Sequence, residues 1–167
     1  MSQLVRLTEA HREAFLAMAE DWRLSGDDRF ADGRLDFTSY VRRLDDHEKG
    51  IGLPKDFVPA TTFWLVDGDR IIGRSSIRHS LTPNLEREGG HVGYDIRPSE
   101  RRKGYGTLIL ALTLPRASAL GLHRVLVTCD EDNHASMRII EKNGGVASES
   151  ALAESGKKKR RYWIAVD

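Results

Sequence analysis

One stretch decides the fold: Gly89-Gly-His-Val-Gly-Tyr-Asp-Ile-Arg-Pro-Ser-Glu-Arg-Arg-Lys-Gly-Tyr-Gly-Thr107. Its first half alternates in the manner of a β-strand, and its second half is a basic turn punctuated by glycines. The apolar run 108–112 that follows predicts a helix. Backbone N–H groups in such a turn and the positive end of the helix dipole both attract anions. The stretch therefore predicts a site for a phosphorylated ligand.

Working outward from this stretch, the residue patterns alternate between strands and helices. The expected strands are 4–7, 61–66, 71–78, 91–97, 124–129, 145–150 and 161–166. The expected helices are 9–24, 37–48, 104–120 (with Pro115 as a possible kink) and 133–142, while 25–34, 50–59 and 84–90 are expected to be irregular or polar connections.

These elements predict a mixed α/β fold in a single domain over residues 1–167. The strands 91–97 and 124–129, joined by a helix, should be parallel with a right-handed crossover. Asp67-Gly68-Asp69 instead marks an antiparallel hairpin. We expect a central mixed sheet of six to seven strands with about four helices on both faces.

Composition restricts the classes of function. The chain has 26 Lys and Arg against 25 Asp and Glu, and this balance argues against bulk binding of nucleic acid. There is no apolar run of membrane-spanning length, no apolar N-terminal signal segment and only one cysteine, Cys129. The six histidines lack the spacing of metal ligands. We expect a soluble cytoplasmic protein without a metal or a membrane partner.

Three kinds of glycine-rich, phosphate-binding loop could explain the opening stretch. The chain contains no Gly-x-x-x-x-Gly-Lys-Ser/Thr, and Gly104-Tyr-Gly106 lacks the third glycine of a dinucleotide fingerprint. The remaining pattern, Arg101-Arg-Lys-Gly-Tyr-Gly106, resembles the acyl-CoA signature of the GNAT family of N-acetyltransferases, Arg/Gln-x-x-Gly-x-Gly/Ala. A second motif is similar to that family's Asn-x-x-Ser/Ala and Tyr-Glu-Lys-x-Gly-Phe, and it comprises Asn133, Ser136, Glu141, Lys142 and Gly144.

The resemblance implies acetyl-CoA as co-substrate, held where the two parallel strands splay apart. Its pantetheine arm would pair with the exposed strand edge, as an added strand does. The resemblance assigns cofactor contacts to the backbone of Asp95 and Ile96, to the loop residues Arg101, Arg102, Lys103, Gly104, Tyr105, Gly106 and Thr107, and to Asn133 and Ser136.

The resemblance to the family's motifs does not identify the general acid or the general base. Ile140 stands where the family usually has the tyrosine that protonates the leaving thiolate, and Gly145 replaces the usual Phe. Tyr94 and Tyr105 are the nearby candidates for the acid. His91 occupies the place of a glutamate that acts as base in many relatives, and Glu86 and Glu88 are its rivals.

The resemblance implies an N-acetyltransferase that moves an acetyl group from acetyl-CoA to a primary amine by direct attack. The acceptor would be a small molecule or a peptide, and a homodimer is possible. One alternative is an acyl-CoA-binding module without catalysis, which Ile140 motivates. Another is a nucleic-acid-binding regulator that uses the run Lys157–Arg161, although a solvated hairpin loop explains that run more simply.

Overall fold

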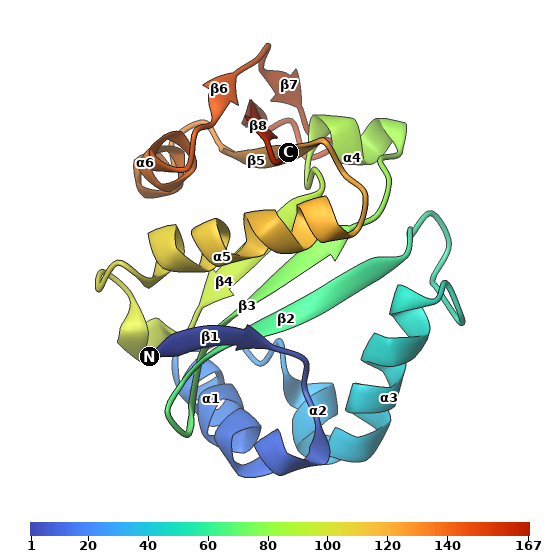
Figure 1. Cartoon of the computed structure of the whole chain (residues 1–167), viewed down its shortest axis with the longest axis vertical. Helices are drawn as coiled ribbons and strands as arrows, with labels where there is room; N and C mark the ends of the chain where they lie inside the picture. Colours follow the sequence, from blue (N-terminus) through green and yellow to red (C-terminus); the bar gives the residue numbers. More distant parts are fainter.

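The structure of the chain, a computed structural model, describes residues 1–167 and contains two antiparallel sheets (Figure 1). The first sheet has the order β1 (Ser2–Val5), β2 (Ala60–Asp67), β3 (Arg70–Arg78), β4 (Val92–Ile96). In the second sheet, β8 (Lys158–Ala165) lies between β5 (Arg124–Asp130) and β6 (Val146–Ala147), and it also pairs with β7 (Ala151–Leu152). The mixed α/β class is confirmed.

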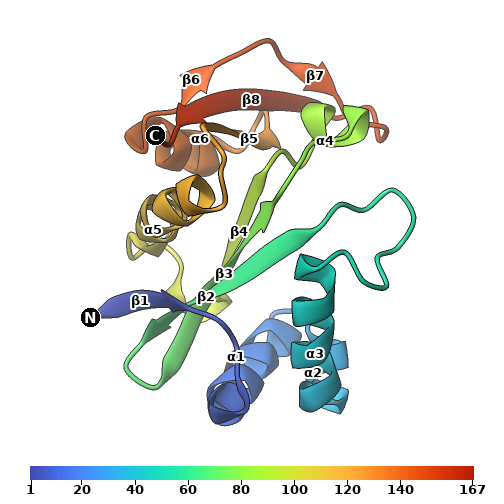
Figure 2. The same ribbon diagram turned by 45° about the vertical axis from the view of Figure 1, so that its right-hand side comes forward.

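Helices cover both faces of the first sheet. The α-helices are α1 (Arg12–Leu24), α2 (Ala31–Leu35), α3 (Phe37–Glu48), α4 (Pro83–Arg87), α5 (Tyr105–Ala119) and α6 (His134–Lys142), and the 3-10 turns are η1 (Glu9–His11) and η2 (Pro98–Glu100). Figure 2 shows α1, α2 and α3 packed together at one end of the molecule and the second sheet at the other end. None of the helices combines the length and the apolar character needed to cross a membrane.

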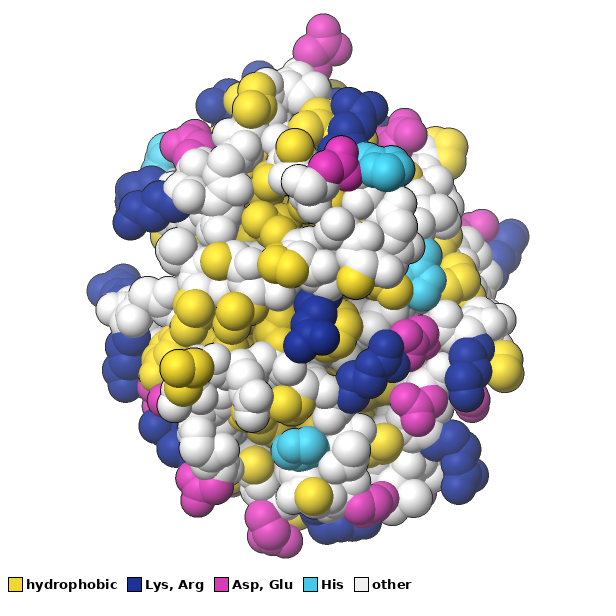
Figure 3. Space-filling view, in the orientation of Figure 1, with side chains coloured by type: hydrophobic (Ala, Val, Ile, Leu, Met, Phe, Trp, Pro, Cys, Tyr) yellow, Lys and Arg dark blue, Asp and Glu magenta, His cyan; other side chains and the backbone are white.

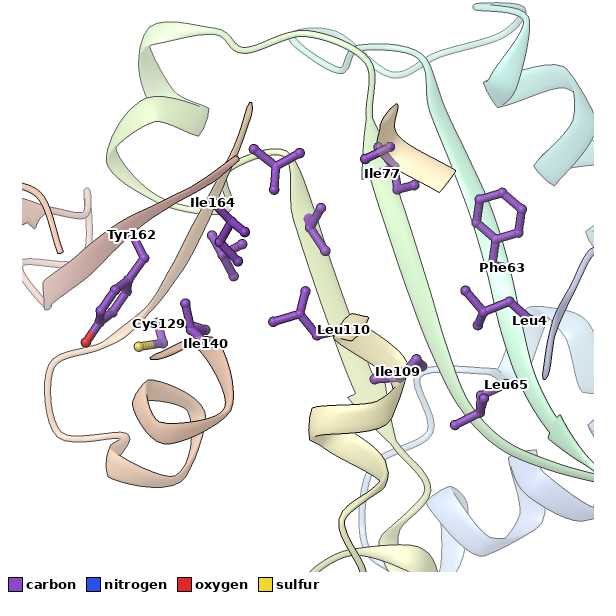
Figure 4. Close-up of a cluster of buried hydrophobic side chains, with 14 of the residues drawn as sticks. Leu4, Phe63, Leu65, Ile77, Ile109, Leu110, Cys129, Ile140, Tyr162 and Ile164 are labelled. Carbon is purple, nitrogen blue, oxygen red and sulfur yellow. The ribbon is translucent and has the colours of Figure 1, made fainter. Parts of the chain in front are cut away.

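Two apolar clusters hold these layers together. Under α1–α3, Phe15 lies 5.1 Å from Phe37 and 5.6 Å from Trp64 between ring centroids, so the aromatic side chains fix the helices to β2. The larger cluster joins the first sheet, α5, α6 and the second sheet (Figure 4). Ile109 and Leu110 of α5 lie at its centre and are fully buried. Figure 3 shows further hydrophobic side chains on the surface around the place where Figure 1 has α5.

The structure corrects several expected boundaries. It has eight strands rather than six to seven, because the expected strand 145–150 is replaced by the two-residue strands β6 and β7. The expected loop 25–34 contains the start of α2, which the buried Phe30 anchors. The expected polar connection 84–90 contains most of α4, where Thr82 caps the helix by accepting from Leu85 N–H at 3.2 Å. Pro115 does not shorten α5, which continues to Ala119.

The expected parallel pair is present only as a splayed pair. No ladder joins β4 to β5, so the two strands are splayed as the resemblance implied, while the expected single central sheet is divided into two sheets. The two meet where His91 N–H donates to Leu126 O at 2.8 Å. Gly90 permits this approach, since a Cβ there would lie 2.4 Å from Leu126 O. Beyond this contact both strands leave in the same direction, and a cleft opens between them.

Candidate active site

A cavity of about 800 Å³ lies between the diverging strands β4 and β5. The turn after β4, the start of α5 and one face of α6 complete its walls. The residues predicted from the sequence that line it are Ile96, Arg101, Arg102, Gly104, Gly106, Thr107, Asn133, Ser136 and Tyr94. The fold thus brings the two sequence motifs to opposite walls of one cleft.

The basic turn places free N–H groups at one end of this cleft. Gly104 has a φ of +85° and begins α5 without any side-chain cap, so the first amides of the helix keep their donors available. Arg102 also has a positive φ, +60°. The turn is anchored by the buried Glu100, which pairs with Arg70 and with Lys103 Nζ at 3.2 Å. This arrangement of free N–H groups at a helix start is suited to bind an anion.

Two predicted loop residues lie outside the cleft wall. The ammonium group of Lys103 is directed to Glu100, and the Tyr105 hydroxyl donates to Asp67 Oδ2 at 3.4 Å. The Tyr105 side chain therefore holds the start of α5 to β2, whereas the Lys103 side chain makes its contact within the turn. Their backbone amides remain part of the turn at the start of α5.

The register of β4 decides which backbone groups face the cleft. Arg97 N–H donates to Ile72 O at 2.8 Å, and Arg78 N–H donates to His91 O at 2.7 Å. Since antiparallel pairs alternate, odd-numbered residues of β4 bond to β3, and Val92, Tyr94 and Ile96 direct their N–H and C=O groups to the open edge.

This alternation separates the two backbone contacts expected at the end of β4. Ile96 faces the cleft as expected, whereas the backbone of Asp95 is used by β3. The carboxylate of Asp95 accepts from Arg29 at 2.7 Å and from Arg74 at 2.6 Å. Asp95 therefore fixes the connection between α1 and α2. The free backbone of Tyr94, which the sequence reasoning did not select, takes its place at the edge.

A pair of hydroxyl groups spans the middle of the cleft. Tyr94 Oη lies 3.0 Å from Ser136 Oγ, so β4 and α6 are bridged at this point. Asn133 Oδ1 accepts from Ser136 N–H at 3.1 Å and thereby caps α6. Burial raises the pKa of the Tyr94 hydroxyl and also that of the nearby Cys129 thiol. Both groups therefore keep their protons at neutral pH.

The predicted base His91 lies beside the cleft rather than on its wall. Only 7% of the residue is exposed, and Nδ1 accepts a hydrogen bond from Leu126 N–H at 2.9 Å. Together with the bond from His91 N–H, this contact fastens β4 to β5 at a single position. Burial, with the charges of Arg124 and Arg78, lowers the pKa of His91.

The stability of the fold should depend on the neutral state of His91. Because the pKa of His91 is lower in the folded chain than in the unfolded chain, the unfolded chain binds the proton more readily as the pH falls through about 6.5, and the free energy of unfolding decreases there. His91→Asn keeps an acceptor but removes the titration. Urea unfolding between pH 5 and 8 should give a shallower pH slope for the variant, by up to about 1.4 kcal/mol per pH unit. Equal slopes would show that His91 does not carry this dependence.

Of the other sequence candidates, only Lys159 of the basic run Lys157–Arg161 lines the cavity. Glu88 is half-buried and neighbours Gly89, but its side chain does not line the cavity, and Glu86 is exposed. Ile140 is fully buried in the larger apolar cluster. In the basic run, Lys157 and Lys159 both pair with Asp130, so part of its charge is compensated. No group of three or more His, Cys, Asp and Glu side chains has an arrangement that could hold a metal ion.

A family model described as "Acetyltransferase (GNAT) domain" matches residues 3–146. The chain therefore belongs to the GNAT acetyltransferase family.

Solved structures share this fold at low sequence identity. RimL, titled a ribosomal L7/L12 alpha-N-protein acetyltransferase in complex with coenzyme A, is 14% identical with a TM-score of 0.70, covering 99% of this chain and 94% of that one. Mycobacterium smegmatis RimJ, in complex with CoA-disulfide, is 15% identical with a TM-score of 0.72, covering 98% and 81%. A spermidine N-acetyltransferase chimera from Vibrio cholerae and hSSAT is 14% identical with a TM-score of 0.65, covering 98% and 95%. No curated protein sequence matches the chain.

Proposed function

We propose that the chain transfers an acetyl group from acetyl-CoA to a primary amine. Its membership in the GNAT family supports acetyl transfer, and structures with the same fold contain coenzyme A or acetyl-CoA. The observation that carries the proposal is the cleft itself, in which an uncapped helix start and an unpaired strand edge face the same cavity. These two features suit the two halves of coenzyme A.

The residues present fit this co-substrate. The amides at the start of α5 and Arg102 suit the pyrophosphate, and Arg138 and Lys142 on α6 add positive charge to the same cavity. Gly106 allows α6 to pack closely, since a Cβ there would lie 2.6 Å from Ile139 Cδ1. The free N–H and C=O groups of Tyr94 and Ile96 suit the amide groups of the pantetheine arm.

Bound acetyl-CoA supplies an activated acetyl thioester. The cleft-facing N–H groups of β4 can then donate to the negative charge that develops on the carbonyl oxygen. The Tyr94 hydroxyl holds a proton at Oη, in a buried position and in contact with Ser136 Oγ. We assign to Tyr94 the protonation of the leaving sulfur, the role left open by Ile140.

We propose that His91 acts as a positioning residue for the splayed strands rather than as the base. Its Nδ1 is already occupied by Leu126 N–H. The two carboxylates that line the cleft are also committed, because Glu100 pairs with Arg70 and Asp130 pairs with Lys159. The acceptor amine is therefore proposed to bind as its free base, with its proton passing to water in the open cleft.

Two measurements on the full chain test this function. Calorimetry with coenzyme A should detect binding that Arg138→Glu weakens about 10- to 100-fold, because one charge-assisted contact is lost. Arg42→Glu, an equal charge change on the exposed face of α3, should leave the affinity unchanged. Thiol release from acetyl-CoA with a panel of amines should then show turnover. Tight binding without thiol release on any amine would favour the non-catalytic module instead.

A further inference from the structure

Arg78, at the end of β3, contributes a positive charge to the cleft wall that the co-substrate does not explain. Its Nη1 donates to Gly89 O at 3.0 Å and to Gly90 O at 3.1 Å, so the guanidinium is held in place by backbone groups. Its other donors, Nε and Nη2, form no hydrogen bond within the protein. A fixed guanidinium with free donors is suited to bind a carboxylate or phosphate.

No acidic side chain neutralises this charge. Arg78 forms no salt bridge with any carboxylate of the chain, and it is only half-exposed. The nearest charged side chain on its own strand, Arg74, is paired with Asp95, and Arg124 and His91 add no negative charge. Burial and the charge of Arg74 lower the pKa of Arg78. A partly buried cation without an anionic partner is costly, and an anionic ligand would reduce that cost.

The position of Arg78 places such a ligand at the acceptor side of the reaction. Its Nη1 lies 4.0 Å from the point where Gly93 would carry a Cβ, and Gly93 precedes Tyr94. Because side chains alternate along a strand, Arg78 is on the opposite face of the sheet from the Tyr94 ring. On the Arg78 face, the half-exposed Thr62 and Ser76 add polar groups, with their hydroxyl oxygens 3.2 Å apart. The basic turn lies beyond the other end of β4.

We propose that Arg78 binds a carboxylate or phosphate carried by the amine acceptor, so that the preferred acceptors are anionic amines such as amino acids or acidic peptides. This inference rests on the proposed acetyltransferase function. The same geometry disfavours polyamines, since Arg78 repels a second ammonium group. Arg78 is thus a specificity-determining residue whose anion lies within a few bonds of the reacting amine.

The test compares each acidic acceptor with its neutral counterpart. Amino acids and short peptides are assayed by thiol release beside their carboxamides, with O-phosphoethanolamine as the phosphate arm and spermidine as the cationic arm. We expect kcat/KM for the carboxylate or the phosphate form to exceed that of the neutral form by about 10- to 100-fold, which corresponds to one charge-assisted hydrogen-bond pair. Whichever of the two anionic forms is preferred identifies the natural group.

Arg78→Met should abolish this preference, and Arg78→Lys should retain part of it, because the charge remains while the fork of donors is lost. Calorimetric binding of the preferred anionic amine should weaken by the same factor in Arg78→Met, independently of turnover. The melting temperature and coenzyme A affinity of each variant establish that it folds. If Arg78→Met fails to fold, the test is the ratio of kcat/KM for the anionic acceptor to kcat/KM for its neutral counterpart in Arg78→Lys. A ratio equal to that of the wild type would contradict the role of the Arg78 donors.

The outcomes separate the two proposals. Turnover with equal or better use of neutral and cationic amines would leave the acetyltransferase function standing and overturn the role of Arg78. An anion preference that survives in Arg78→Met would do the same. Coenzyme A binding without turnover on any amine would remove the acetyltransferase function, and the acceptor site with it.

Discussion

Gly90→Ala is expected to destabilise the fold by about 2–4 kcal/mol, because two independent costs fall on this residue. Its φ of +61° is unfavourable for a residue with a Cβ, and the added Cβ would lie 2.4 Å from Leu126 O, a backbone atom that cannot rotate away. Urea unfolding at pH 7.5 measures the change. Because Gly90 lies at the junction of β4 and β5, coenzyme A affinity should fall as well.

Gly121→Ala is the matched control for this prediction. Gly121 has a φ of +90°, but a Cβ there would meet nothing within 4 Å. It should therefore show only the backbone cost, about 1 kcal/mol, and no change in coenzyme A affinity. Equal effects of the two substitutions would mean that the close approach of β4 to β5 adds nothing to stability.

Tyr94→Phe is expected to lower kcat about 100-fold while leaving coenzyme A affinity nearly unchanged. The substitution keeps the ring but removes the Oη that contacts Ser136 Oγ. Its backbone N–H and C=O groups stay at the cleft edge, so the pairing surface for the co-substrate is preserved. Thiol release at saturating acetyl-CoA measures the effect.

Two further observations distinguish a proton donor from a structural tyrosine. Tyr105→Phe removes a hydroxyl that contacts only Asp67, outside the cavity, and should retain wild-type kcat. Since the pKa of Tyr94 is raised, the wild-type rate should not fall on account of this group below about pH 10, and Tyr94→Phe should lack any decline above it. A wild-type kcat in Tyr94→Phe would remove the residue from the mechanism.

The sequence predicted a helix or strand well where neighbouring residues in the chain determine it. The hairpin at Asp67-Gly68-Asp69 and the start of α5 at the basic turn follow from glycines and alternation, and both are present. The short helices α2 and α4 were missed because tertiary contacts and a single threonine cap stabilise segments too short to show a helical period. The separation of β5 from β4 was expected from the family resemblance alone, because neither strand's own pattern indicates it.

The roles of the candidate-site residues were likewise predictable where residue type determines them and not where contacts between distant segments do. The motif residues Gly104 and Asn133 have backbone and capping roles that follow from residue type, and both line the cleft. The register between β4 and β3 decides which of two adjacent residues directs its backbone groups to the cleft. The sequence does not show this register, and the expected backbone contact was therefore assigned to Asp95 instead of Tyr94. His91 has a residue type suited to catalysis, yet its Nδ1 is used by a backbone amide brought from 35 positions along the chain.

The open edge of β4 also has a consequence for how the protein behaves in a concentrated solution. A strand with unpaired backbone groups is a template on which a strand from another molecule can add. Here the opposite wall of the cleft, formed by β5 and α6, restricts access to that edge, so that a single extended ligand fits where a whole sheet does not. The splay that is proposed to admit the co-substrate should thus also shield the chain from edge-to-edge aggregation.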